Sequence, residues 1–351
     1  MKKSRKITSL LLTAAMAVGL LAGCSGNSSS AGSSGISSKA SSEASSVSVS
    51  SEPVEKTAVN IAVLKGPTAF GAVKLMEDNE AGTTKNSYNF SMSTSPEEIV
   101  SKITTGEVDI AAAPANLAAT LYQKTKGKIK LAAVNTLGVL YILEKGDSIQ
   151  SVADLKGKTI YATGQGATPE YSLDYILLQN EIDPESDVTI EWKSEHSELA
   201  TLVAAGEADI ALLPEPFVTQ VLSKNADIRI ALDLTKEWKS AGTGSELITG
   251  AMIAGSAFVD ENKDAFDSFL EEYKASVDYV NANVADSAAL IEKFGIISAA
   301  VAEKAIPNCN IVYIDGADMK TYAADYFSVL FNADPKSVGG ALPDDNLYYQ
   351  K

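Results

Sequence analysis

Few residues of this chain carry the groups that catalysis usually needs. The single histidine, His196, has two acidic neighbours, Glu195 and Glu198. Nucleophilic catalysis needs a base held beside the nucleophile, and no second histidine is present to complete a zinc site with His196. These residues therefore favour binding over enzymatic activity, and we expect neither a metal site nor a cofactor.

Residues with binding potential follow a segment that occurs twice, one hundred positions apart. Gly106 to Pro114 and Gly206 to Pro214 share Gly, Glu, Asp, Ile, Ala and Pro in the same order and spacing. The glycine is typical of a helix end, and the apolar run that follows is typical of a buried parallel strand that stops at proline. We expect helices over 97–105 and 198–205 before these strands. One copy alone is ordinary in an α/β protein, but two copies suggest two lobes that face a cleft.

Two further loops follow predicted strands and offer free amide groups. After the strand over 59–64, a Gly-Pro-Thr turn presents Thr68 at a helix start, as a cap or as a contact to a polar ligand. The loop over 164–169 places Thr168 as the N-cap of a helix, with Pro169 in its first turn. Because Pro169 stands where a dinucleotide fingerprint has its third glycine, we expect no nucleotide cofactor.

The carboxylate of Glu215 lies at a predicted helix start beside the cleft. It either stabilises the helix dipole or contacts the ligand. In the second case an amine or an amino-heterocycle is favoured over nitrate or a sulfonate. Tyr141, Tyr161 and Trp192 could stack on a flat ligand, although aromatic residues at strand ends more often pack in the core.

The first residues of the chain predict secretion. A basic head over 1–6 and an apolar stretch over 7–21 form a secretory signal, and Leu21-Ala22-Gly23 then precedes Cys24. This motif resembles a bacterial lipobox, which implies lipid (palmitate) on Cys24; plain secretion with cleavage nearby is the alternative. Serine accounts for 15 of the 27 residues over 25–51. We expect a flexible tether with a mean reach of roughly 30 Å.

The chain is acidic, with a formal net charge of −16. Removal of residues 1–23, which carry four basic and no acidic side chains, leaves 25 basic against 45 acidic residues, or −20. Such a surface argues against nucleic acid as a partner. Cys309 is the only cysteine besides Cys24, so a lipidated chain has no internal disulfide.

Taken together, the mature region resembles solute-binding lipoproteins of ABC importers, of the nitrate/sulfonate/taurine/thiamine-precursor type. The resemblance rests on Cys24, the loop over 65–68, Gly106-Glu107-x-Asp109, the segment over 154–158, the loop over 164–169, and the segment over 206–217. It implies an α/β, bilobal periplasmic-binding-protein-like fold (type 2), with two Rossmann-like lobes joined by two crossovers. The implied divisions are a signal peptide (1–23), the lipidated cysteine and linker (24–56), lobe 1 (57–143), lobe 2 (144–246) and the return to lobe 1 with C-terminal helices (247–351).

The resemblance also implies where the ligand binds. Thr68, Pro114, Asn116, Thr168 and Glu215 would line the cleft. Further candidates from the same loops are Lys65, Pro67, Asn135, Thr136, Gly166, Ala167, His196 and Phe217. Related proteins often carry tryptophan immediately before the Glu-Pro pair, whereas this chain has Pro214.

The implied function is capture of a small organic solute by lobe closure, outside the cell membrane. The ligand would be either an aminopyrimidine-like thiamine precursor or a sulfonate, taurine or nitrate. The implied partners are a transmembrane permease, its cytoplasmic ATPase and the membrane itself through Cys24, and we expect a monomer. A surface receptor that is not coupled to transport is the alternative.

Overall fold

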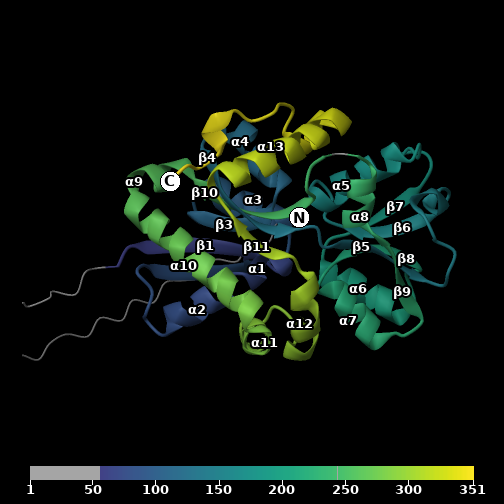
Figure 1. The fold of residues 1–351 in the computed structure, drawn as a ribbon, viewed down its shortest axis with the longest axis horizontal. Coiled ribbons are helices and arrows are strands. Elements are labelled where there is room, and N and C mark those ends of the chain that lie inside the picture. The colour runs from purple at the N-terminus through teal and green to yellow at the C-terminus, as the bar shows by residue number, and fades with distance from the viewer. Residues whose placement is uncertain (1–55, 243) are drawn as a thin grey trace, which may run out of the picture. The chain divides into compact units, whose positions relative to one another are not determined.

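Two β-sheets organise the part of the chain that the structure describes, residues 56–242 and 244–351 of a computed structural model. Each sheet is flanked by helices (Figure 1). The predicted signal peptide, Cys24 and the serine-rich tether lie outside the described residues. The mixed α/β architecture with two sheets confirms the predicted bilobal fold.

The first sheet has the strand order β11-β4-β10-β3-β1-β2. Its strands are β1 (Ala58–Leu64), β2 (Ser87–Ser93), β3 (Ile110–Pro114), β4 (Ile129–Leu137), β10 (Ile248–Gly255) and β11 (Ile311–Ile314). β1 pairs in parallel with β2 and β3, while β10 runs antiparallel to β3 and β4. All five residues of β3 are buried, as expected for an apolar strand inside a covered sheet.

The second sheet has the strand order β7-β6-β8-β5-β9. Its strands are β5 (Leu140–Lys145), β6 (Thr159–Thr163), β7 (Thr189–Lys193), β8 (Ile210–Pro214) and β9 (Ile228–Asp233). β8, the strand of the second repeat, pairs in parallel with β6 and antiparallel with β5. Each repeat therefore supplies an inner strand of a different sheet, with a parallel neighbour on one side and an antiparallel neighbour on the other.

The chain passes between the sheets twice. β4 ends at Leu137 in the first sheet, and β5 begins at Leu140 in the second. Our placement of residues 139–143 in lobe 1 is therefore wrong: hydrogen bonding of β5 to β8 and β9, which the local sequence does not reveal, puts this run in the second sheet. The second crossover, between β9 and β10, contains α8 (Leu234–Ser240).

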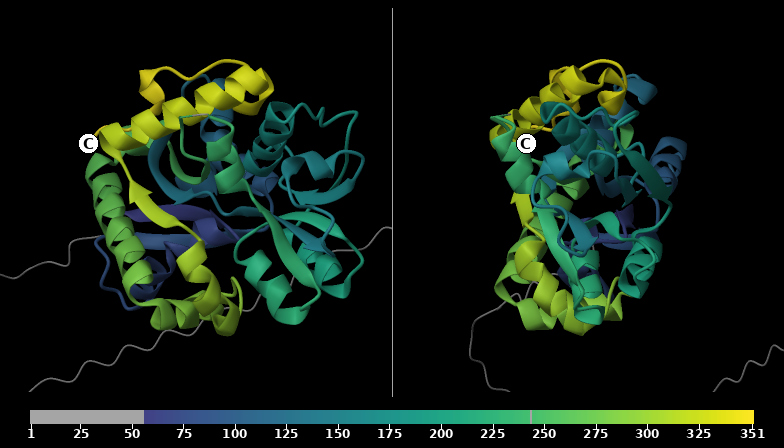
Figure 2. Two further views of the ribbon diagram at one scale, coloured as in Figure 1. Left: turned by 45° about the vertical axis from the view of Figure 1, so that its right-hand side comes forward. Right: turned by 90° about the vertical axis from the view of Figure 1, so that its right-hand side faces the viewer.

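Helices cover both sheets. They are α1 (Pro67–Phe70), α2 (Val73–Glu80), α3 (Pro96–Thr105), α4 (Asn116–Thr125), α5 (Thr168–Gln179), α6 (His196–Ala205), α7 (Phe217–Lys224), α9 (Ser256–Glu261), α10 (Lys263–Ala282), α11 (Val284–Lys293), α12 (Ala299–Ala305) and α13 (Gly316–Ala333). α3 and α6 end at Gly106 and Gly206, both left-handed, as the repeat predicts. α13 contacts β4 and β10 of the first sheet and also α5 (Figures 1 and 2). We call the first sheet with its helices lobe 1 and the second sheet with its helices lobe 2.

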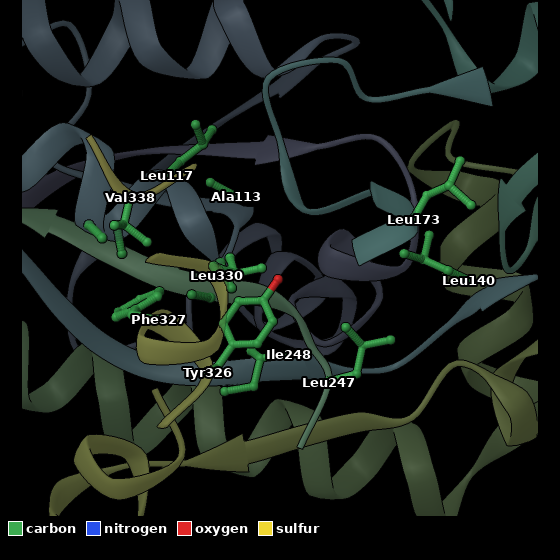
Figure 3. Packing of buried hydrophobic residues seen from close by; sticks show 14 of the residues in the cluster. Ala113, Leu117, Leu140, Leu173, Leu247, Ile248, Tyr326, Phe327, Leu330 and Val338 are labelled. Atoms are coloured by element: carbon green, nitrogen blue, oxygen red, sulfur yellow. The ribbon is translucent and has the colours of Figure 1, made fainter. Parts of the chain in front are cut away.

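One hydrophobic cluster extends through both lobes. Figure 3 shows Tyr326 between the lobe 1 residues Phe327 and Val338 and the lobe 2 residues Leu140 and Leu173. All five side chains are buried. Moving the lobes apart at this point would expose apolar surface to water, which is unfavourable. The cluster therefore restrains how the lobes can separate.

Candidate ligand-binding site

The carboxyl ends of β1, β3 and β8 meet at a small cavity between the lobes. Its volume is about 40 Å³. The wall contains the two prolines that end the repeated strands, Pro114 and Pro214. The complete lining is Leu64, Lys65, Pro67, Thr68, Pro114, Val139, Leu140, Pro169, His196, Pro214 and Thr249. Ligands of open α/β sheets bind at this edge, so the cavity is the candidate site.

Lobe 1 supplies the only lysine of the wall. Lys65 follows the last residue of β1, and its backbone amide donates to the carbonyl of Ser93 at 2.8 Å. The side chain is half-buried, and its ammonium group makes no hydrogen bond or ion pair with the described residues. Thr68 donates its hydroxyl to the carbonyl of Leu64 at 3.1 Å, so this hydroxyl closes the turn into α1. The wall thus combines a cation that has no partner among the described residues with a fixed hydroxyl.

Lobe 2 contributes a neutral imidazole. A hydrogen bond of 2.6 Å joins His196 Nδ1 to the hydroxyl of Thr163, and the ring lies 5.3 Å from the ring of Phe217. Burial lowers the pKa of His196 to about 4, so the ring is uncharged near neutral pH. Phe217 packs behind His196 and does not line the cavity. The ring is only partly exposed, unlike a free residue at a helix start.

Glu215 lies outside the lining of the cavity. Its side chain is 3% exposed. Oε2 accepts from the backbone amide of Thr219 and Oε1 from the Thr219 hydroxyl, each at 3.0 Å. Burial raises the pKa of Glu215, while the two bonds from Thr219 lower it. This geometry fits the alternative in which the carboxylate stabilises the start of the helix that follows it, α7.

Asn116 links the lobes beside the cavity. Its Nδ2 donates to the carbonyls of Gly166, at 3.4 Å, and Ser337, at 3.1 Å. Its Oδ1 accepts from the Thr168 hydroxyl at 3.4 Å. Ala167 is the N-cap of α5, so our prediction of Thr168 as N-cap is wrong by one residue, because Ala167 still has an extended backbone. Asn116, Gly166 and Thr168 form an inter-lobe contact, and neither they nor Ala167 are part of the lining.

Asn135 and Thr136 lie behind Thr68. Asn135 Nδ2 donates to the carbonyl of Thr68 and to the hydroxyl of Tyr273, both at 3.2 Å. Thr136 donates its hydroxyl to Asn135 Oδ1 at 3.1 Å. Both side chains are buried. They support the Thr68 turn from within lobe 1, and neither faces the cavity.

Several lining residues escaped the sequence analysis. Val139 belongs to the first crossover, and Leu140 is the first residue of β5. Thr249 lies on the wall because β10 places it beside Ala115, whose amide donates to the Thr249 carbonyl at 3.2 Å. These residues become neighbours through pairing of strands that are distant in the sequence, which no local sequence pattern predicts. For Pro214 the sequence predicted the end of a strand and the replacement of tryptophan, but not a place on the cavity wall. The aromatic residues Tyr141, Tyr161 and Trp192 do not line the cavity.

Over 56–242 and 244–351, no cluster of three or more His, Cys, Asp or Glu side chains is arranged to hold a metal ion. Within the same residues, no helix is both long and apolar enough to span a bilayer.

Two α/β lobes, two crossovers and a cavity between the carboxyl ends of their strands define a bilobal ligand-binding protein. The sequence model of the ABC-transporter phosphonate periplasmic substrate-binding proteins matches residues 80–302, more than half of the chain. The chain belongs to this family. It is therefore the extracytoplasmic substrate-binding component of an ABC transporter, a transport role and not an enzymatic one. A search of curated protein sequences gave no match.

Solved structures of similar fold agree with this assignment. A crystal structure of an ABC transporter from Parabacteroides distasonis is 25% identical, with a TM-score of 0.69, over 84% of this chain and 100% of the other. The alkanesulfonate-binding protein SsuA of Xanthomonas axonopodis pv. citri, bound to MOPS, is 16% identical (TM-score 0.66; 84% and 97% covered). The periplasmic aliphatic sulphonate-binding protein SsuA of Escherichia coli is 14% identical (TM-score 0.66; 84% and 93% covered). At these identities the last two show the fold alone.

Proposed function

We propose that the protein captures a small organic solute with an anionic group, such as a sulfonate or a phosphonate. The observation that carries this proposal is the ammonium group of Lys65, which is half-buried on the cavity wall and has no partner among the described residues. A buried or partly buried charge is unfavourable unless an opposite charge pairs with it, and a ligand anion would supply that charge. Glu215, which would favour an amine or an aminopyrimidine, has its carboxylate engaged by Thr219.

Apolar residues would receive the organic part of such a solute. Leu64, Val139 and Leu140 form one part of the wall, and Pro114 and Pro214 another. His196 is uncharged near neutral pH, so it would offer a hydrogen bond without competing with Lys65 for the anion. This composition fits a ligand with a charged head and a short apolar tail better than it fits nitrate.

Lobe movement is part of the proposal. A cavity of about 40 Å³ is close to the volume of one water molecule, whereas ligand pockets usually measure about 300–1,000 Å³. The lobes would separate to admit the solute and then close on it. Contacts from both lobes to one ligand would make the closed arrangement the favoured one. The permease would then take the solute from the closed form, and ATP hydrolysis by the associated ATPase would drive transport.

We also propose the cellular setting. The lipid on Cys24 would anchor a monomer to the outer face of the cell membrane, with the serine-rich segment as tether. Intact-mass measurement of protein from native membranes would detect a diacyl or triacyl modification of Cys24. A mature chain that begins elsewhere and carries no lipid would contradict the anchor.

Thermal unfolding tests the ligand class. The mature chain would be scanned with alkanesulfonates, taurine, alkylphosphonates, nitrate, aminopyrimidines, thiamine and flavins. A ligand at a thousandfold its dissociation constant adds about 4 kcal/mol, which raises the midpoint by several degrees. We expect an anionic solute to raise it, Lys65→Met to abolish the rise, and the exposed-site control Lys124→Met to retain it. A rise with aminopyrimidines alone, or one that survives Lys65→Met, would contradict the proposal.

A further inference from the structure

Three aromatic rings from different parts of the fold pack against one another, with tilted planes, where the lobes meet. Tyr175 belongs to α5 of lobe 2, Trp238 to α8 in the second crossover, and Tyr326 to α13 on lobe 1. The centroid distance is 4.9 Å from Tyr175 to Trp238 and 5.5 Å from Trp238 to Tyr326. Trp238 and Tyr326 are fully buried. This aromatic cluster is a direct contact between lobe 1, lobe 2 and a crossover, and none of its three rings lines the cavity.

The two crossovers meet at α8, the helix that carries Trp238. Trp238 Nε1 donates to the carbonyl of Ser245 at 3.2 Å, which fixes the ring to the segment leading into β10. Thr235, also in α8, packs against Gly138 of the first crossover so tightly that a Cβ on Gly138 would lie 2.1 Å from the Thr235 hydroxyl oxygen. Because both crossovers contact α8, the three aromatic rings lie where the two lobes are connected.

Tyr326 also reaches the helix that forms part of the cavity wall. Its hydroxyl lies beside the hydroxyls of Thr168 and Ser172, in the first two turns of α5, and burial raises the pKa of Tyr326 to about 12. Among the described residues the Tyr326 and Ser172 hydroxyls have no hydrogen bond of normal geometry. Pro169, the neighbour of Thr168, lines the cavity. A shift of Tyr326 would therefore move the first turn of α5, which carries the lining residue Pro169.

We propose that Tyr326 is a positioning residue for ligand capture: its ring, on Trp238, and its contact with the first turn of α5 hold the lobe 2 wall against lobe 1. Tyr326 does not touch the ligand. Its loss would favour arrangements in which α5 has moved away from α13. Since a binding-competent state that is less populated binds with lower apparent affinity, ligand capture would weaken. The effect on affinity rests on the proposed function, whereas the effect on α5 does not.

Hydrogen–deuterium exchange without ligand tests the positioning. We expect Tyr326→Leu to raise the exchange rate of the α5 amides about tenfold, the size expected for the loss of one aromatic pair, while β1 and α10 amides stay unchanged. Tyr322→Leu is the matched control, one turn earlier on the same helix and 38% exposed. Tyr326→Phe keeps the ring, so we expect an increase of less than threefold. An α5 rate equal to that of the control, or a uniform rise at all amides, would overturn the inference.

Calorimetric titration with ethanesulfonate and ethylphosphonate tests the consequence for capture. For whichever probe the wild type binds, we expect Tyr326→Leu to raise the dissociation constant about tenfold and Tyr322→Leu to leave it unchanged. Equal constants for Tyr326→Leu and wild type would overturn the role in capture. If the wild type binds neither probe, the proposed ligand class fails, and the exchange measurement still decides the positioning of α5.

Discussion

The two copies of the repeated segment have the same backbone, yet the residues around them make different contacts. Gly106 and Gly206 end their helices with φ of 75° and 76°, and each is followed by a fully buried strand that stops at proline. Asn116, two residues after the first proline, donates across the lobe boundary to Gly166. Glu215, directly after the second proline, accepts hydrogen bonds from Thr219 of the helix that follows it, α7.

The helices that precede the strands differ in a similar way. α3 begins with Pro96 and α6 with His196, one hundred positions apart. Pro96 has no titratable group and does not line the cavity, whereas His196 does. The same supersecondary unit therefore builds both lobes, while single side chains at its two ends decide which of them line the candidate cavity, cross the lobe boundary or stabilise a neighbouring helix.

Asn116→Ala and Glu215→Ala should show the largest effects. Each removes a buried hydrogen-bonding group, so we expect each to lower the free energy of unfolding by about 1–3 kcal/mol in urea titrations. Only Asn116→Ala should also raise the dissociation constant of the ligand, because of the two side chains only that of Asn116 makes a hydrogen bond between the lobes. Equal effects of the two variants on affinity would remove the distinction between the copies.

Glu215→Gln sharpens this comparison through pH. Burial raises the pKa of Glu215 in the folded state above its ordinary value of 4.5, so the stability tied to its protonated form is present below pH 4.5 and is lost as pH rises through the folded pKa. Glutamine does not titrate. We therefore expect the free energy of unfolding of Glu215→Gln to rise relative to that of wild type between pH 4 and pH 7. A constant difference over this range would show that Glu215 keeps an ordinary pKa.

Gly106→Ala and Gly206→Ala should each cost about 1 kcal/mol of unfolding free energy, because alanine is strained at positive φ. A Cβ on Gly106 meets nothing within 4 Å, whereas one on Gly206 would lie 2.7 Å from Lys145 Nζ. The lysine tip can move aside, so we expect the two costs to agree within about 0.5 kcal/mol. A much larger loss in Gly206→Ala would show that the position of Lys145 is structurally important.

The smallest effect concerns His196. Burial lowers the pKa of His196 from about 6.5 to about 4, so the folded protein favours the neutral ring. The stability that this preference supplies is present above pH 6.5 and is lost as pH falls toward 4. Between pH 7 and pH 6 we expect wild type to lose about 0.5 kcal/mol relative to His196→Gln, measured by urea titration at each pH. The reverse slope would mean that the folded protein favours the imidazolium.

The sequence predicted the elements whose signals are local. Helix ends at Gly106 and Gly206, buried strands after them and proline stops follow from backbone preferences of single residue types, and all are present in the structure. The lobe membership of residues 139–143 could not be predicted in this way. An apolar run of that length fits an inner strand of either sheet, and only its pairing with β8 and β9 decides between them.

For the site, the sequence identified the loops but not the roles of their residues. Lys65, Thr68, Pro114 and His196 lie on the cavity wall because each is at or next to the end of a strand or the start of a helix at the carboxyl edge of a sheet. For Glu215, burial and the position of Thr219 direct the carboxylate toward the helix that follows it, which only the folded structure reveals. Asn116 acquires its partners Gly166 and Ser337 from distant segments. Local backbone preference thus determines the units, whereas long-range packing determines what each side chain meets.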